Sequence, residues 1–165
     1  MASTMASRDE APGDSRITEN ALDSICRQVH TQTVLVIRTQ RIKEQVEDLV
    51  ARAKSGDRFA FKMAQYLLDQ LTYLRDLDCE PLEDTATLKR VRQSAKHQVW
   101  RLSHGFDADM AVRLICWFKP SGKEVVVTLF FADKAQMGDV FYDSVGSRSD
   151  QIIDQWIREH PGGEA

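Results

Sequence analysis

The sequence lacks the features that mark most metal-bound and disulfide-rich proteins. Its three cysteines, Cys26, Cys79 and Cys116, are far apart and form no CxxC pair, so neither a zinc site nor a disulfide framework is indicated. The four histidines are scattered, and the nearest pair, His97 and His104, falls on opposite faces of one expected strand. There is also no glycine-rich phosphate loop, no nucleophile elbow and no HExxH motif. We therefore expect no metal and no cofactor.

Long apolar runs are missing as well. No stretch approaches the roughly 20 apolar residues that a membrane helix needs, and the first residues lack the apolar centre of a signal peptide. With 42% hydrophobic and 28% charged residues, the 165-residue chain has an ordinary globular composition. These properties predict a cytoplasmic protein with no membrane partner.

The net charge of −3 argues against a dedicated nucleic-acid binder, but the charge is unevenly distributed. Residues 1–84 carry −4, residues 85–123 carry +6 and residues 124–165 carry −5. Between Leu88 and His104 there are five basic side chains, two histidines and no acid. This basic segment is either an anion-binding surface or a solvated strand face that its acidic neighbours balance.

Hydrophobic periodicity predicts an α+β domain. We expect helices where apolar residues recur every three to four positions, and strands where β-branched and aromatic residues are dense. The expected helices are residues 14–30, 40–54, 58–77 and 147–159, and the expected strands are residues 33–39, 85–92, 98–104, 110–118 and 124–132. Short turns join the later strands, which predicts an antiparallel sheet packed on the helical hairpin at residues 40–77.

The two ends of the chain are expected to differ from its centre. Residues 1–13 and 161–165 are small and polar, and we expect them to be disordered tails. Residues 14–31 are expected to form an N-terminal helical extension, and residues 32–160 to form the α+β domain with its own C-terminal helix.

An arginine interrupts the apolar strand at residues 110–118. Alternation turns one set of its side chains toward the helices: Met110, Val112, Leu114, Cys116 and Phe118. The same rule turns these neighbours inward: Trp100, Leu102, Val125, Val127, Leu129 and Phe131. Arg113, Trp117 and Arg101 then share the other face of the sheet. If that face is open, its charges and rings suit the phosphates and bases of RNA. Alternatively, the C-terminal helix covers it and Arg113 pairs with one of the acids of that helix.

The helix end LLDQLTYLRDL is followed by the strands HQVWRLSH, VRLICWF and VVVTLFFADK. This succession resembles the RelE/ParE-type toxins of bacterial toxin–antitoxin pairs, in particular their phage-derived RelE-like branch. The resemblance covers about residues 32–142, roughly two thirds of the chain. It implies a RelE-like fold, in which a strand and a helical hairpin precede an antiparallel sheet and a C-terminal element. The N-terminal helix is an addition to that fold.

The resemblance implies a toxin of a type II toxin–antitoxin pair. Such a toxin is a metal-independent endoribonuclease that cleaves messenger RNA, often on the ribosome, and a cognate antitoxin holds it inactive. The reaction needs a group for the ribose 2′-hydroxyl, cations for the phosphate and an acid for the leaving 5′-oxygen. The resemblance implies that Arg113, which matches the strand arginine of the family, stabilises the phosphate. Lys134 matches the basic residue that follows the last strand in the family, and Tyr142 lies where some members have a tyrosine after that strand. His104 is the nearest imidazole and the candidate acid or base.

RNA binding is assigned to the basic segment and to one ring. The candidate residues are Arg101, Trp117, Lys89, Arg92 and Lys96. A second interpretation is a non-catalytic RelE-like protein that binds a protein partner through its sheet. A neighbouring gene for a small DNA-binding antitoxin would favour the toxin.

Overall fold

The structure, a computed structural model, describes residues 34–120, 122–138 and 140–161. The expected tail at residues 1–13 and the expected helix at residues 14–30 lie outside the described residues. So does all of the expected C-terminal tail except Pro161. The described residues all belong to one unit of the chain, Thr33–Ala165.

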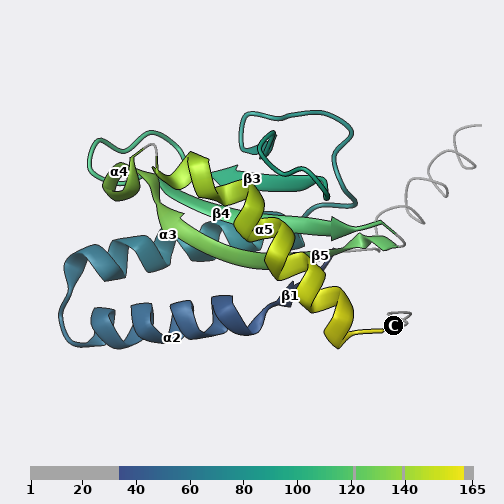
Figure 1. Ribbon diagram of the computed structural model, residues 1–165. Helices are drawn as coiled ribbons and strands as arrows, with labels where there is room; N and C mark the ends of the chain where they lie inside the picture. Colours follow the sequence, from purple (N-terminus) through teal and green to yellow (C-terminus); the bar gives the residue numbers. More distant parts are fainter. Residues whose placement is uncertain (1–33, 121, 139, 162–165) are drawn as a thin grey trace, which may run out of the picture. The chain divides into compact units, whose positions relative to one another are not determined.

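Five strands form one sheet in the order β1-β5-β4-β3-β2 (Figure 1). They are β1 (Leu35–Arg38), β2 (Leu88–Arg90), β3 (Val99–Ser103), β4 (Val112–Lys119) and β5 (Gly122–Asp133). Strands β2 to β5 each pair antiparallel with the next, which confirms the expected adjacency of the three strongest predicted strands. β1 pairs parallel with β5, so the sheet is mixed. The antiparallel order expected for the strands within residues 85–132 is confirmed, and β1 adds a parallel strand to it. The parallel pairing is possible because two helices separate β1 from the other strands in the chain.

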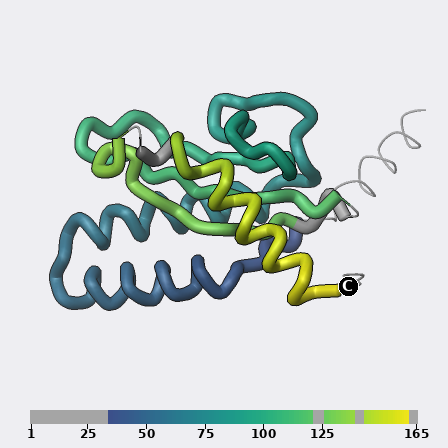
Figure 2. The backbone as a smooth tube through the Cα atoms, viewed as in Figure 1, coloured from purple at the N-terminus to yellow at the C-terminus, as the bar shows by residue number. Residues whose placement is uncertain are grey.

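The helices are α2 (Gln40–Lys54), α3 (Arg58–Arg75), α4 (Lys134–Met137) and α5 (Val140–Glu159). The expected helical hairpin is confirmed as α2 and α3, which run side by side (Figure 2). Both begin at a capping residue: Thr39 Oγ1 accepts the N–H of Ile42 at 3.4 Å, and Asp57 accepts two N–H groups of α3 at 3.0 Å. Gly56, with φ +98°, makes the turn between them.

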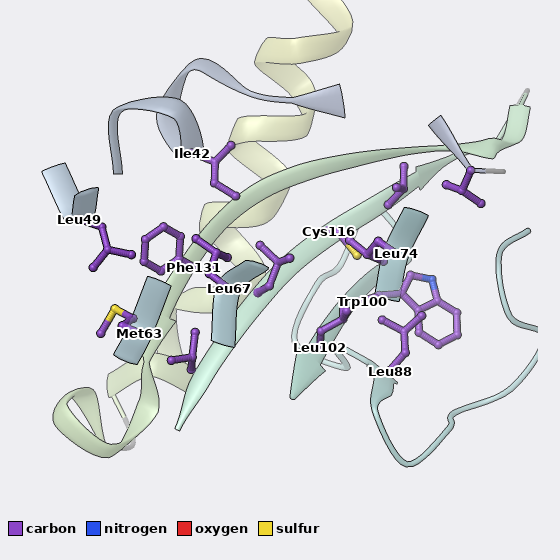
Figure 3. Packing of buried hydrophobic residues seen from close by; sticks show 14 of the residues in the cluster. Ile42, Leu49, Met63, Leu67, Leu74, Leu88, Trp100, Leu102, Cys116 and Phe131 are labelled. Atoms are coloured by element: carbon purple, nitrogen blue, oxygen red, sulfur yellow. The ribbon is translucent and has the colours of Figure 1, made fainter. Parts of the chain in front are cut away.

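The hairpin packs on one face of the sheet, which we call the hairpin face. Alternate residues of β3 and β4 point into this core as predicted, each at most 2% exposed: Trp100, Leu102, Val112, Leu114, Cys116 and Phe118. Figure 3 shows Met63, Leu67 and Leu74 of α3 among these side chains. Full burial of one such side chain stabilises a fold by roughly 1.5–3 kcal/mol. The hairpin face therefore supplies a large part of the stability of the domain.

β5 departs from strict alternation. Its pairing with β4 skips Leu129, which is an extra residue in β5, as in a β-bulge. As a result Val126 lies in the core under the hairpin, while Val127 lies on the opposite face; beyond the bulge Phe131 lies under the hairpin as expected. The predictions that Val127 and Leu129 face the helical hairpin are wrong, because one inserted residue exchanges the faces of the residues on one side of it.

Past the end of β1, the edge of β5 is closed by side chains from the beginning of α2. Thr39 Oγ1 donates to the carbonyl oxygen of Leu129 at 3.0 Å. The amide of Gln45 donates to the carbonyl oxygen of Phe131 at 3.1 Å and accepts the N–H of the same residue at 3.2 Å. An uncovered edge would expose these backbone groups for pairing with another chain. The contacts also fix the beginning of α2 against β5.

The other face of the sheet is crossed by α5, and we call it the α5 face (Figure 1). A second core lies there: Val91, Val99, Ile115, Trp117, Val127, Leu129, Phe130, Val145, Ile153 and Trp156. Of the two alternatives for this face, the structure confirms that the C-terminal helix covers part of it. α5 begins at Val140, well before the expected start at residue 147.

Gly146, a glycine inside α5, explains why the sequence predicts a later start for this helix. A Cβ atom on Gly146 would lie 2.1 Å from the carbonyl oxygen of Gln93, so only glycine lets α5 approach the segment after β2 this closely. A glycine in a helix costs about 1 kcal/mol relative to alanine, which is why the sequence predicts the helix only beyond it. Asp150 then fixes the contact by accepting hydrogen bonds from Ser94 Oγ at 2.6 Å and from two backbone N–H groups at 3.1 and 3.3 Å.

Candidate functional site

A pocket of about 310 Å³ lies where β2, β3 and the beginning of α5 meet. It is lined by Asp84, Lys89, Arg90, Val91, Arg92, Gln93, Arg101 and Val145. We call it the cationic pocket because four of these residues are basic and one is acidic. The structure brings together three of the predicted RNA-binding residues here: Lys89, Arg92 and Arg101.

Strand pairing sets the positions of the basic residues on the sheet. Lys89 of β2 is directly opposite Arg101 of β3, and Ser103 of β3 is opposite Arg113 of β4. The alternation of each strand places all four on the α5 face. Like charges directly opposite each other destabilise an antiparallel pair. An anion bound beside Lys89 and Arg101 would offset that repulsion.

The two strand arginines are held in place by the sheet. Arg101 and Arg113 are half-buried, and the Nε atom of each is buried. Nη1 of Arg113 donates to the carbonyl oxygen of Val112 at 3.1 Å. A guanidinium is always charged and presents a planar fork that matches phosphate oxygens. β3 and β4 therefore present permanent cations on a rigid support.

Arg90 shapes the rim of the cationic pocket. Its Nη2 donates to the carbonyl oxygen of Leu82, and its backbone N–H donates to Asp84 Oδ1 at 3.0 Å. Its guanidinium carbon lies 5.3 Å from the centre of the Trp100 ring. Arg90 therefore ties the loop before β2 to the strand.

Trp117 lies in the core under α5. It is 3% exposed, and its ring meets the rings of Trp156 and His97 edge to face, with centroids 5.8 Å apart in each pair. In this arrangement an RNA base has no access to the ring. The sequence could not show this, because alternation gives the face on which a side chain lies but not what covers that face.

Lys96 is held in an ion pair with α5. Its Nζ lies 2.7 Å from one carboxylate oxygen of Asp154, and the other oxygen lies 3.0 Å from Nε2 of His97. The hydrogen bond from Lys96, followed by that from His97, lowers the pKa of Asp154 to about 2, and the same carboxylate raises the pKa of Lys96. This predicted RNA-binding residue therefore anchors the segment after β2 to α5.

His104 lies on the hairpin face of the sheet, whereas Arg113 lies on the α5 face. Its ring stacks on Tyr66 of α3 with centroids 3.8 Å apart. Nδ1 lies 2.6 Å from the carbonyl oxygen of Gly105, and Nε2 accepts the N–H of Val112 at 2.9 Å, which assigns the neutral tautomer with the proton on Nδ1. Both nitrogens are bonded to the backbone, so the structure does not bring His104 together with Arg113 as an acid or base.

Asp107 fixes the same loop to α3. Its Oδ2 lies 2.5 Å from Lys62 Nζ and accepts the Tyr66 hydroxyl at 2.7 Å. The hydrogen bonds from Lys62 and then Tyr66 lower the pKa of Asp107 well below its usual range, and the pKa values of both donors are raised. The group is a clamp between α3 and the loop that joins β3 to β4.

Lys134 and Tyr142 follow β5 in the chain. Lys134 begins α4, and its backbone N–H donates to the carbonyl oxygen of Ala111 at 2.9 Å, which places it beside the beginning of β4. Tyr142 lies in the first turn of α5, three residues before Val145 of the cationic pocket. The side chain of Tyr142 lies outside what the structure describes.

Arg148 is a further cation on the α5 face, and sequence analysis missed it. Its guanidinium carbon lies 4.4 Å from the centre of the Phe130 ring. Phe130 pairs with Ile115, two residues beyond Arg113 in β4. The signal for Arg148 in the sequence is weak, because this residue stands in the acidic region 124–165. In addition, the expected helix begins only after Gly146, so the sequence does not show which face of the helix carries Arg148.

Within the described residues, no group of three or more His, Cys, Asp or Glu side chains could hold a metal ion. In the same part of the chain no helix combines the length and the apolarity needed to cross a membrane. Comparisons with protein-family models, curated proteins and solved structures find no match to this chain.

Proposed function

We propose that this chain is a RelE-like toxin that binds messenger RNA at the cationic pocket and cleaves it without a metal ion. The observation that carries the proposal is the directly opposite pair of cations Lys89 and Arg101 on β2 and β3, with Arg113 of β4 diagonal to Arg101 on the same face. Cations grouped in this way suit the phosphates of RNA. The element order, in which β1, a helical hairpin, four antiparallel strands and a terminal helix follow one another, supports a RelE-like fold.

In the proposed reaction the ribose 2′-oxygen attacks the adjacent phosphorus, and the bond from phosphorus to the 5′-oxygen breaks. Negative charge grows on the other phosphate oxygens, and Arg101 and Arg113 stabilise it. One proton leaves the 2′-hydroxyl and one reaches the 5′-oxygen. These transfers are assigned to Lys134 and Tyr142, because both nitrogens of His104 are bonded to the backbone. A cognate antitoxin would hold the enzyme inactive, and the ribosome would present the messenger.

The decisive experiment is cleavage of a reporter messenger RNA, with and without ribosomes. Arg113→Ala should reduce the rate on the order of a hundredfold, as removal of one preorganised charge donor does. Arg113→Lys should recover part of it, since a point charge does not reproduce the fork. Arg58→Ala removes an exposed cation at the beginning of α3 and is the matched control. Equal cleavage by wild type and Arg113→Ala, with equal melting temperatures, would rule out the catalytic role of Arg113.

A non-catalytic RelE-like protein is the second candidate. One observation supports this second candidate. The sequence assigns both His104 and Trp117 to RNA chemistry, but in the structure they hold the fold together. In this case an acidic segment of a protein partner occupies the cationic pocket. Salt-sensitive co-purification with the product of a neighbouring gene, together with intact reporter RNA, would identify this second function.

A further inference from the structure

A second pocket, of about 520 Å³, lies at the opposite end of α5 from the cationic pocket. One wall comes from the end of β1 and the first turn of α2, and the other from the last turns of α5. Its lining includes the charged and ring side chains of Arg38, Arg41, Lys43, Glu44, Glu159 and His160. We call it the α2–α5 pocket.

The first wall carries three exposed cations, Arg38, Arg41 and Lys43. Arg41 and Lys43 stand in the first turn of α2, which has no acidic residue. Cations at this end of a helix oppose its dipole, so they are unfavourable for stability by a few tenths of a kcal/mol or more each. Among the described residues, none of the three cations has a carboxylate oxygen within 4.0 Å. Their arrangement is therefore not explained by helix stability or by ion pairs.

The two acids of the pocket form no ion pair with these cations. Glu44 accepts a hydrogen bond from the side-chain amide of Gln40 at 3.0 Å, and Glu159 accepts one from the amide of Gln155 at 2.7 Å. Both acids are thus bonded within their own helices. The cations of the first wall remain available to an anion that enters the pocket.

The second wall offers a flat ring. His160 is exposed and stacks on the buried Trp156, with centroids 4.4 Å apart and planes 16° from parallel. Its Nδ1 lies 2.9 Å from the carbonyl oxygen of Trp156, which fixes the ring against the end of α5. One face of the His160 ring contacts Trp156, and the residue is exposed within the described part of the chain. Fixed aromatic and imidazole faces of this kind are platforms on which nucleic-acid bases stack.

We propose that the α2–α5 pocket binds one nucleotide of single-stranded RNA, with its phosphate on Arg38, Arg41 and Lys43 and its base on the outer face of His160. The identity of the ligand as RNA rests on the proposed function, whereas the site itself is separate from the cationic pocket. Val145 and Trp156 mark the two sites and lie about 16 Å apart along α5 at 1.5 Å per residue. An RNA that reaches both must therefore be several nucleotides long.

The test is the binding of a labelled single-stranded 12-nucleotide RNA, followed by fluorescence anisotropy over a range of salt concentrations. The double variant Arg41→Ala/Lys43→Ala should bind about tenfold more weakly, with a salt slope smaller by about 0.7, since single strands lose about 0.7 in slope for each phosphate contact. Arg58→Ala/Arg75→Ala removes two exposed cations elsewhere on the chain and should bind like wild type. Melting curves establish that each variant is folded.

A second variant separates stacking from charge. His160→Ala should weaken RNA binding by about fivefold or more at every salt concentration, because stacking is worth roughly 1–3 kcal/mol per base and is not ionic. His160→Phe should restore most of the affinity. Inorganic polyphosphate is the control ligand without bases, and His160→Ala should not change its affinity. RNA binding unaffected by His160→Ala would overturn the proposal and leave a non-selective anion site.

The outcomes separate this inference from the proposed function. If Arg92→Ala/Arg101→Ala abolishes RNA binding and the α2–α5 variants bind like wild type, the inference is wrong and the proposed function stands. If only the α2–α5 variants lose binding, the inference stands and the cationic pocket is not the RNA site. If wild type binds no RNA at all, both fail.

Discussion

The two faces of the sheet differ in what their polar residues do. On the hairpin face, polar groups complete the fold: both nitrogens of His104 are bonded to the backbone, and Asp107 clamps a loop to α3. On the α5 face, the strands place Lys89, Arg101 and Arg113 beyond the edge of an apolar core. The first arrangement lowers the free energy of the folded chain. The second places Lys89 directly opposite Arg101, and like charges in that position repel each other.

The faces also differ in how their helices are attached. α2 and α3 meet the sheet through a broad core, in which the residues of β3 and β4 are at most 2% exposed. α5 has a smaller core and depends on a few specific contacts, namely the close approach at Gly146 and the carboxylates Asp150 and Asp154. A change in the hairpin core should therefore unfold the domain, whereas a change under α5 should alter one helix and the sites beside it.

The largest expected effect comes from the hairpin core. Leu74→Ala should lower the free energy of unfolding by roughly 2–5 kcal/mol, because Leu74 is 0% exposed and its removal leaves a cavity. Leu71→Ala is the matched control in the same helix. Leu71 is only half-buried, so the loss should be clearly smaller. Urea unfolding of both variants measures the difference, and equal losses would mean that the core is not centred as described.

Gly146→Ala should break the attachment of α5. Its Cβ would meet the Gln93 carbonyl at 2.1 Å, so the backbone must move, which typically costs about 1–3 kcal/mol in a packed site. This cost opposes a gain of up to about 1 kcal/mol in helix propensity. We expect a lower melting temperature and faster hydrogen exchange in α5. Gln151→Ala, at an exposed position of the same helix, should show neither change. A more stable Gly146→Ala variant would show that α5 does not lie against Gln93.

Much of the hairpin face could be predicted from the sequence, because Arg113 fixes the register of residues 110–118. Ile115 and Trp117 are apolar and buried on the other face, so the single arginine is what assigns Val112, Leu114 and Cys116 to the hairpin core. In β5 the run VVVTLFF is apolar on both faces, because α5 covers the second one. Such a run contains no signal for the extra residue Leu129, and the prediction for Val127 failed there.

The site was only partly predictable, for a related reason. The charge count located the basic segment, and strand pairing brings Lys89 and Arg101 together with Arg92 in one pocket. Whether a candidate side chain is free depends on contacts far away in the sequence. Lys96 binds an acid of α5, and Trp117 is covered by the same helix. No local pattern reports such partners.

The pH dependence of stability should differ between wild type and a variant on the α5 face. The pKa of Asp154 is lowered to about 2 in the folded chain, first by the hydrogen bond from Lys96. A lowered pKa stabilises the fold above the unfolded value of about 3.8, and this stability is lost as pH falls toward 2. Asp154→Asn should therefore be less stable than wild type at pH 6 and equal to it near pH 2. Melting temperatures across this range test the prediction, and a pH-independent difference would mean that the carboxylate charge is not what stabilises the contact.

The smallest effect gives the sharpest comparison of the two faces. Lys89 is exposed and directly opposite Arg101, so Lys89→Ala should raise the stability of the free protein by a few tenths of a kcal/mol at low salt. The gain should vanish at about 1 M salt, where charges are screened within about 3 Å. The same variant should bind RNA more weakly, with a salt slope smaller by about 0.7. A residue whose removal stabilises the fold and weakens binding is placed for its ligand. If Lys89→Ala instead destabilises the protein equally at all salt concentrations, its side chain serves packing, and the repulsion across β2 and β3 does not point to an anion.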